Sequence, residues 1–200
     1  MRQPGAAPVA ALGEGALSRR PQPRLRAGGT TLRAWSRSDA AVLVRAYADP
    51  DIQRWHGRSL SHDQAEEWVA YEGSRWATDL GGSWAITRSD VVLGRVGLND
   101  MSLAEACAGV TYWVLPEARG RGVAVAALLA VVDWAFDELG LHRLELNHST
   151  ANVASCRVAV RTGFLEEGTK RSRALHLDGW HDMHAHAVLA DDPRQTGRSA

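Results

Sequence analysis

Residues 110–140, VTYWVLPEARGRGVAVAALLAVVDWAFDELG, decide the fold of this 200-residue chain. The apolar and aromatic run over 110–115 predicts a β-strand, which Pro116 ends. After a glycine-rich bend, apolar residues recur at helical spacing until Gly140, a natural helix stop; they are Leu128, Val131, Val132, Ala135, Phe136 and Leu139. The sequence therefore predicts a strand, a tight bend and an amphipathic helix in succession.

The bend, RGRGVA over residues 119–124, has the composition of a phosphate-binding loop. Its two glycines let the backbone approach a ligand, and the first amides of the following helix have no partner inside it. Those amides, the helix dipole and two arginines suit a pyrophosphate. A P-loop would need Lys-Ser or Lys-Thr after the last glycine, and a dinucleotide fingerprint would need a glycine where Val125 stands. The segment does match the loop [Gln/Arg]-x-x-Gly-x-[Gly/Ala] of acetyl-CoA-dependent N-acetyltransferases, with a plain turn in an arginine-rich chain as the alternative.

Patterns on both sides of this stretch predict a mixed α/β chain around one sheet. They comprise a helix from Ser36 or Ser38 to about Tyr47, a helix opened by the capping box of residues 61–64, a hairpin of 84–87 with 91–98, a strand at 144–146, a helix capped by Asn152, and a hairpin of 173–177 with 180–189.

Composition fits one ordinary domain. Lys and Arg number 23, as do Asp and Glu, so a whole-domain electrostatic attraction to nucleic acid or an anionic membrane is disfavoured. No run of 18 apolar residues is present, which excludes a membrane-spanning helix. Cys107 and Cys156 cannot form a disulfide framework and lack metal-ligand spacing, so we expect a reduced, cytoplasmic compartment.

The two ends of the chain differ from the middle. Residues 1–29 carry five arginines among Pro, Gly and Ala without hydrophobic periodicity, which predicts a disordered basic arm. Residues 190–200 predict a second flexible tail, and residues 30–189 the folded domain. The arm could contact nucleic acid or a ribosome, although a solvated tail is the preferred interpretation.

Four ordered motifs extend the match beyond the bend: YWVLPE at 112–117, DWAFDELGLHR at 133–143, NVAS at 152–155 and GFLEEG at 163–168. With RGRG they make residues 30–189 resemble the GNAT superfamily of N-acetyltransferases, most nearly the branch of the ribosomal-protein-alanine N-acetyltransferases. The resemblance implies an α/β (α+β) GNAT fold, in which helices flank a mixed, mostly antiparallel, twisted sheet of six to seven strands.

The resemblance also implies where acetyl-CoA would bind. In the family the fourth and fifth strands splay apart and the pantetheine arm lies along the fourth strand, which is edge-strand recognition applied to a cofactor. A backbone amide near Val114 would face the thioester oxygen. The implied cofactor-binding residues are Trp113, Val114, Arg119, Gly120, Arg121, Gly122, Val123, Ala124, Asn152 and Ser155.

The acid and base are harder to assign. Many relatives carry a tyrosine general acid four residues before the Gly-Phe pair, where this chain has Ala159. Ser155 is the candidate to reprotonate the CoA thiolate. The expected fourth strand also lacks a carboxylate, which leaves Glu105 and His148 as alternative candidates for the general base.

The resulting prediction is an acetyl-CoA-dependent N-acetyltransferase that acts by direct attack of a primary amine. The acceptor is either the N-terminal α-amine of a protein, favoured by an open groove, or a small amine, favoured by an acidic pocket. Trp55 and Trp76 could line that pocket. The alternative is a catalytically silent acyl-CoA-binding or regulatory module of the same fold, and the chain could be a monomer or a homodimer.

A polar cluster on the last expected strand offers a zinc site as an alternative. It contains His181, Asp182, His184 and His186, of which the last three share a face by the two-residue period. No third ligand is evident nearby and the family needs no metal, so the sequence predicts none.

Overall fold

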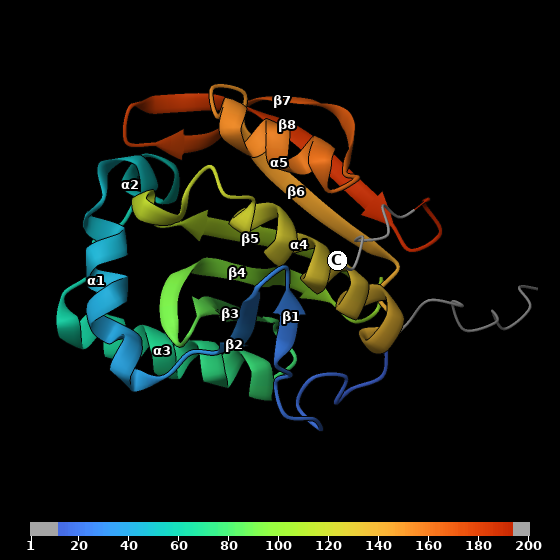
Figure 1. The fold of residues 1–200 in the computed structure, drawn as a ribbon. Coiled ribbons are helices and arrows are strands. Elements are labelled where there is room, and N and C mark those ends of the chain that lie inside the picture. The colour runs from blue at the N-terminus through green and yellow to red at the C-terminus, as the bar shows by residue number, and fades with distance from the viewer. Residues whose placement is uncertain (1–11, 194–200) are drawn as a thin grey trace, which may run out of the picture.

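Tight turns fold most strands back on their predecessors, and the result is one eight-stranded sheet in the order β1-β2-β3-β4-β5-β6-β8-β7 (Figure 1). The computed structural model describes residues 12–193. Only β5 and β6 run parallel; the other neighbours are antiparallel. The strands are β1 Leu25–Ala27, β2 Thr30–Ala34, β3 Gly82–Arg88, β4 Val91–Ser102, β5 Cys107–Val114, β6 Arg143–Ser149, β7 Leu165–His176 and β8 Gly179–Leu189.

The helices begin and end largely where local signals predict. Ser61 Oγ accepts from the amide of Gln64 and its own amide donates to the Gln64 side chain, so the expected capping box is confirmed. Gly140 ends the central helical segment in the left-handed region at φ +84°. Within residues 12–193, no helix combines the length and apolar composition that crossing a bilayer requires. The helices are α1 Ala40–Ala48, α2 Pro50–His56, α3 His62–Ala77, α4 Val123–Trp134, which a π-helical turn Ala135–Leu139 extends, and α5 Val153–Arg161, with short 3₁₀ turns at Arg37–Asp39 and Pro116–Ala118.

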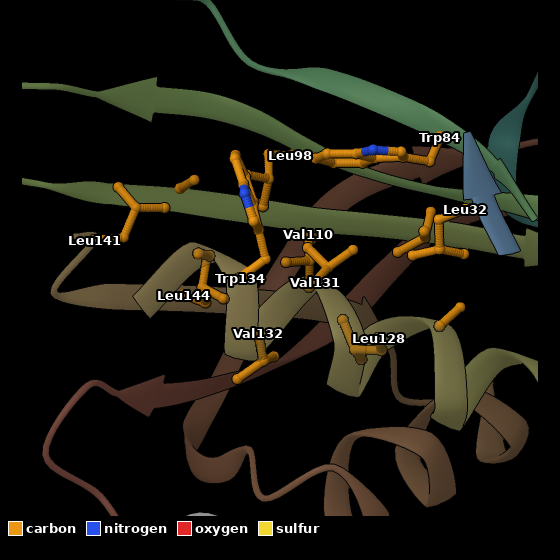
Figure 2. Close-up of a cluster of buried hydrophobic side chains, with 14 of the residues drawn as sticks. Leu32, Trp84, Leu98, Val110, Leu128, Val131, Val132, Trp134, Leu141 and Leu144 are labelled. Atoms are coloured by element: carbon orange, nitrogen blue, oxygen red, sulfur yellow. The ribbon is translucent and has the colours of Figure 1, made fainter. Parts of the chain in front are cut away.

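The main core lies between α4 and the sheet, where Leu128, Val131 and their neighbours face residues of β4, β5 and β6 (Figure 2). Trp76, Trp84 and Trp134 pack together there, with ring centroids 5.4–5.8 Å apart. The expectation that Trp76 lines an acceptor pocket is therefore wrong, because this side chain is buried in the core. A second apolar cluster joins α1, α2 and α3 to Trp113 and Leu115 at the end of β5.

Residues 12–29 pack against the domain, which contradicts the expected disordered arm over this range. Leu17 is fully buried in the main core, and the Asp79 carboxylate accepts the amides of Gly15, Leu17 and Ser18 at 2.7–2.8 Å. The indole N–H groups of Trp76 and Trp84 donate to backbone carbonyls of the same segment. These polar contacts hold a segment that has no hydrophobic periodicity. The rest of the expected arm, residues 1–11, lies outside the described residues.

This segment also explains the strand count. It supplies β1, so the sheet has eight strands rather than the expected six to seven. At the other end, the amide of Ala190 donates to the carbonyl of His142, so the expected tail does not start at residue 190. Residues 194–200 lie outside the described part of the chain.

The sheet opens between β5 and β6. Residues Cys107–Gly109 of β5 pair with Arg143–Glu145 of β6, and the ladder then stops. β5 continues to Val114 along β4, while all of β6 pairs with β8. Figure 1 shows β6 running away from β5 at an angle. One side of β5 from Val110 to Val114 therefore has no strand partner, as the resemblance implies for a pantetheine site.

Candidate active site

A cavity of about 710 Å³ occupies the opening between β5 and β6. The far half of β5 and the end of β6 form two of its sides, and α2 and His176 of β7 close it elsewhere. The start of α4 and one face of α5 complete the lining. Of the residues expected to bind the cofactor, those that line the cavity are Trp113, Val114, Arg119, Gly120, Gly122, Val123, Ala124, Asn152 and Ser155.

The cofactor end of the cavity is built from backbone groups. Trp113 directs its indole away from the cavity, where Nε1 donates to the Tyr47 hydroxyl at 3.3 Å, so it offers its main chain to the opening. Gly120 and Gly122 have φ of +72° and +73°, a region that non-glycine residues rarely adopt. No side chain caps the start of α4, and its first amides have no partner within the helix. This end of the cavity is suited to a phosphate group.

Arg119 has partners other than those expected. Its guanidinium donates to Asp49 at 2.8 Å and to Asp51 at 2.6 Å, and its Nε donates to the Val114 carbonyl at 3.2 Å. Two carboxylates therefore neutralise its charge, and it joins the start of α2 to the end of β5. Arg121 is exposed and does not line the cavity, so neither arginine of the bend offers a free charge to it.

The free positive charges come instead from α5. Arg157 and Arg161 line the cavity and are exposed, and neither forms an ion pair with another residue of the described chain. They lie one helical turn apart and therefore share a face. Sequence reasoning missed them, although their spacing from Asn152 on a predicted helix was a usable signal.

A tyrosine of β5 forms a hydrogen bond inside the cavity. The Tyr112 hydroxyl lies 2.8 Å from Ser155 Oγ, and both residues line the cavity. Burial raises the pKa of Tyr112 to about 12, although the hydrogen bond to Ser155 acts in the opposite direction. Tyr112 therefore stays protonated at neutral pH and can donate.

Comparison with known proteins identifies the family. Residues 30–165 match the model of the acetyltransferase (GNAT) domain. The chain belongs to the GNAT family of acetyltransferases. It is therefore an acetyl-CoA-dependent N-acetyltransferase that acts on an amine, as predicted.

Individual relatives agree with this assignment. YdaF of Bacillus subtilis, named as a proposed ribosomal N-acetyltransferase, is 33% identical over 122 residues, which cover 60% of this chain and 66% of YdaF. The ribosomal-protein-serine acetyltransferase of Escherichia coli is 26% identical over 53% of this chain and 59% of its own length. The chain thus spans about two thirds or less of these curated relatives. RimJ of Mycobacterium smegmatis, solved with a CoA disulfide, superposes with a TM-score of 0.77 at 24% identity, over 84% of this chain and 86% of RimJ.

In this GNAT acetyltransferase only one of the two expected base candidates, Glu105 and His148, lines the cavity. Glu105 is exposed in the turn before β5, at the opposite end of that strand from Val114, and does not line the cavity. This position contradicts a role as general base. His148 does line the cavity, but Nδ1 bonds the Ser149 carbonyl at 2.8 Å and Nε2 lies 3.1 Å from His186 Nε2. Burial lowers the pKa of His148, and neither ring nitrogen is free for an amine.

A different histidine is available to the acceptor. His56, at the end of α2, lines the cavity of the acetyltransferase and is half-buried. Burial lowers its pKa to about 4, the positive charges of Arg95 and Arg58 add to this, and a hydrogen bond to the Tyr112 backbone opposes it. The imidazole is therefore neutral at pH 7. Nothing in the local sequence distinguished this residue, because its position depends on how α2 packs.

The acceptor side of the cavity is closed by contacts between α2 and the β7–β8 hairpin. Trp55 lines the cavity, as expected, and packs edge-on against His176 at 5.7 Å between ring centroids. Arg54 pairs with Asp178 at 3.0 Å. Asp51 is the one carboxylate among the lining residues; it is paired with Arg119, and the arginines of α5 also line the cavity. The cavity is therefore not acidic.

Proposed function

We propose that this enzyme transfers the acetyl group of acetyl-CoA to the N-terminal α-amine of a protein by direct attack. The observation that carries the choice of acceptor is the charge of the cavity, whose single lining carboxylate is held by Arg119. A polycationic small amine would find no free negative charge there, whereas a peptide terminus brings one amine and needs no acidic pocket. The names of YdaF and of the E. coli relative support a protein acceptor.

The described residues fit acetyl-CoA, which supplies an acetyl group activated as a thioester. The unpaired side of β5 from Val110 to Val114 offers backbone groups to a pantetheine amide, as an edge strand does to a peptide. The amides at the start of α4 would hold the pyrophosphate. Arg157 and Arg161 would supply the charges that Arg119 cannot, and Asn152 would contact the cofactor while its Oδ1 caps α5.

Tyr112 and Ser155 would act together as the proton donor to the departing thiolate. Tyr112 would give its proton to the thiolate while the Ser155 hydroxyl donates a hydrogen bond to the resulting phenolate, and a proton from solvent, equal to the one that the amine loses, would restore the phenol. A backbone amide at the end of β5 would stabilise the oxyanion of the tetrahedral intermediate.

The attacking amine needs only modest help. An α-amine titrates near 7.7–8.0, so about a third of it is neutral at pH 7.5. His56, neutral at pH 7, would accept the proton that the nitrogen loses after it bonds to the carbonyl carbon. Neither cysteine of the described chain lines the cavity, which supports direct attack over a covalent acyl-cysteine.

The test compares three acceptors at equal concentration. These are a lysine-free peptide beginning with serine, an N-terminally blocked peptide of the same composition with one lysine, and spermidine. We expect kcat/KM for the free α-amine to exceed that of the others by at least about tenfold, with mass spectrometry locating the acetyl group on the terminus. Faster acetylation of spermidine, or failure of the enzyme to acetylate the free terminus, would contradict the proposal.

A further inference from the structure

Three imidazoles and one thiol converge beside the cavity. His148 comes from β6, His184 and His186 come from β8, and Cys156 comes from α5. One potential ligand atom of each residue lies within 4.8 Å of those of the other three. None of the four has a role in the acetyl transfer proposed above.

The fold itself brings these residues together. In the antiparallel ladder of β6 and β8, His148 is the direct partner of His184, and His186 lies two residues further along β8. Residues two apart on a strand share a face, so all three rings are on the same side of the sheet. Helix α5 packs on β6 and adds Cys156 from another part of the chain (Figure 1). The sequence placed Asp182, His184 and His186 on one face of the last strand; the structure keeps the two histidines in the cluster, and the other two ligands come from β6 and α5.

The geometry fits one tetrahedral ion. The Nε2 atoms of His148 and His186 are 3.1 Å apart. Two imidazoles on one Zn²⁺, with Zn–N of about 2.0–2.1 Å, have nitrogens about 3.3 Å apart. The ligand atoms of Cys156 and His184 lie within 4.8 Å of these two nitrogens and of each other.

The surroundings also match those of metal-bound histidines. Such a histidine usually donates its second ring nitrogen to a carbonyl or carboxylate. His148 does so through Nδ1 to the Ser149 carbonyl at 2.8 Å, and His184 Nε2 lies 3.9 Å from Glu166 Oε1. The Nδ1 atoms of His184 and His186 are buried without a hydrogen-bond partner in the described chain. Coordination of a metal through Nδ1 would give His184 the partner it lacks, whereas without a metal that atom stays unsatisfied at a cost of about 1–3 kcal/mol; His186 would coordinate through Nε2.

We propose that His148, Cys156, His184 and His186 bind one Zn²⁺ per chain. Three neutral imidazoles and one thiolate are a ligand set that zinc binds in tetrahedral geometry. The four ligands fill the coordination sphere, so the ion is structural. It ties α5 to β6 and β8, and α5 carries both Asn152 and Ser155 toward the cavity.

The experiment uses the full chain without an affinity tag, freed of metal by a chelator and then titrated with Co²⁺ and with Zn²⁺. We expect one Co²⁺ per chain, with a thiolate-to-cobalt charge-transfer band and the intense visible bands of tetrahedral cobalt, both abolished by one equivalent of Zn²⁺. Zinc should also raise the melting temperature of the unmodified chain. Absence of the charge-transfer band, or octahedral cobalt spectra, would overturn the proposal without reference to any variant.

Two cysteine variants assign the thiolate. Cys156→Ser should lose the charge-transfer band and weaken Zn²⁺ binding by about 100-fold or more, whereas Cys107→Ser should keep both. Cys107 is the matched control because it lies at the start of β5 and outside the cluster. Equal loss in both variants, or none in Cys156→Ser, would refute the assignment. Far-UV circular dichroism of each metal-free variant reports folding separately from metal binding.

Discussion

Replacing Tyr112 with Phe tests the proposed proton donor most directly. The substitution keeps the ring in place on β5 and removes only the hydroxyl that lies 2.8 Å from Ser155 Oγ. Because the tyrosine contributes no net charge at neutral pH, we expect acetyl-CoA binding to change by less than about twofold.

The size of the effect follows from the leaving group. A thiol has an ordinary pKa of about 8.5, which is about one unit above pH 7.5. At this pH, protonating the departing thiolate is therefore worth about 1.4 kcal/mol. A tenfold loss of rate is therefore the lower bound, and general acid catalysis typically contributes at least about 100-fold. We expect the acetyl-transfer rate of Tyr112→Phe to fall about 10- to 100-fold at pH 7.

The assay is thiol release in a single turnover, so that product release does not mask the chemical step. Above pH 8.5 the free thiolate is stable, and a proton donor accelerates its departure less. The ratio of the wild-type rate to the Tyr112→Phe rate should therefore fall as pH rises from about 7 to 9.5. The pKa of Tyr112 is about 12, so the wild-type hydroxyl remains protonated throughout this range.

Tyr71→Phe serves as the control, because Tyr71 is an exposed tyrosine of α3 that does not line the cavity. A wild-type rate for Tyr112→Phe at pH 7, or a deficit of the same size at every pH, would show that this hydroxyl does not donate the proton.

Three further substitutions test other parts of the structure. Arg119→Ala leaves two carboxylates unpaired beside the phosphate end of the cavity, so calorimetry should find CoA binding weakened about tenfold; unchanged affinity would contradict this. His56→Gln should lower kcat without moving the acid limb of the pH–rate profile. A group of pKa about 4 becomes protonated only as pH falls through 4, so the acid limb reports the titration of the substrate amine. A shift of the acid limb in the variant would assign that limb to His56. Glu72→Gln weakens the buried acceptor of Arg75 and Arg95, and denaturant unfolding should show a loss of up to about 3–5 kcal/mol, whereas a loss below about 1 kcal/mol would argue against a structural role.

Features set by neighbouring residues could be predicted from the sequence. The capping box at Ser61 depends on a few adjacent residues and occurs as expected. The β7–β8 hairpin also forms, but its two-residue turn is Leu177-Asp178 rather than Asp178-Gly179, because Gly179 already pairs with His176. The bend with Gly120 and Gly122 belongs to the same class, because positive φ angles demand glycine regardless of the rest of the fold.

Features set by tertiary packing could not. Tyr112 and Ser155 are 43 residues apart, and their hydrogen bond depends on how α5 crosses the open sheet. The partners of Arg119 are Asp51 and Asp49, which lie at the start of α2, 68 and 70 residues away in the sequence. The composition of the bend suggested that Arg119 binds phosphate, whereas these two carboxylates make it the centre of an ion-pair cluster. The prediction that residues 12–29 are disordered was wrong for a related reason. Their backbone is held by hydrogen bonds to indoles and to the carboxylate of Asp79, which are distant in the sequence.

Helix α2 is the element that links the two ends of the cavity. Its start is held by Arg119, which also contacts the last residue of β5, and near its end Arg54 pairs with Asp178 at the β7–β8 turn. One short helix thus connects the two halves of a sheet that separates between β5 and β6. Because both connections are partly exposed ion pairs, each contributes little to stability by itself. Their importance is positional: they hold His56 and Trp55 in the same cavity as the free edge of β5, where in the proposed reaction the acceptor amine would meet the thioester.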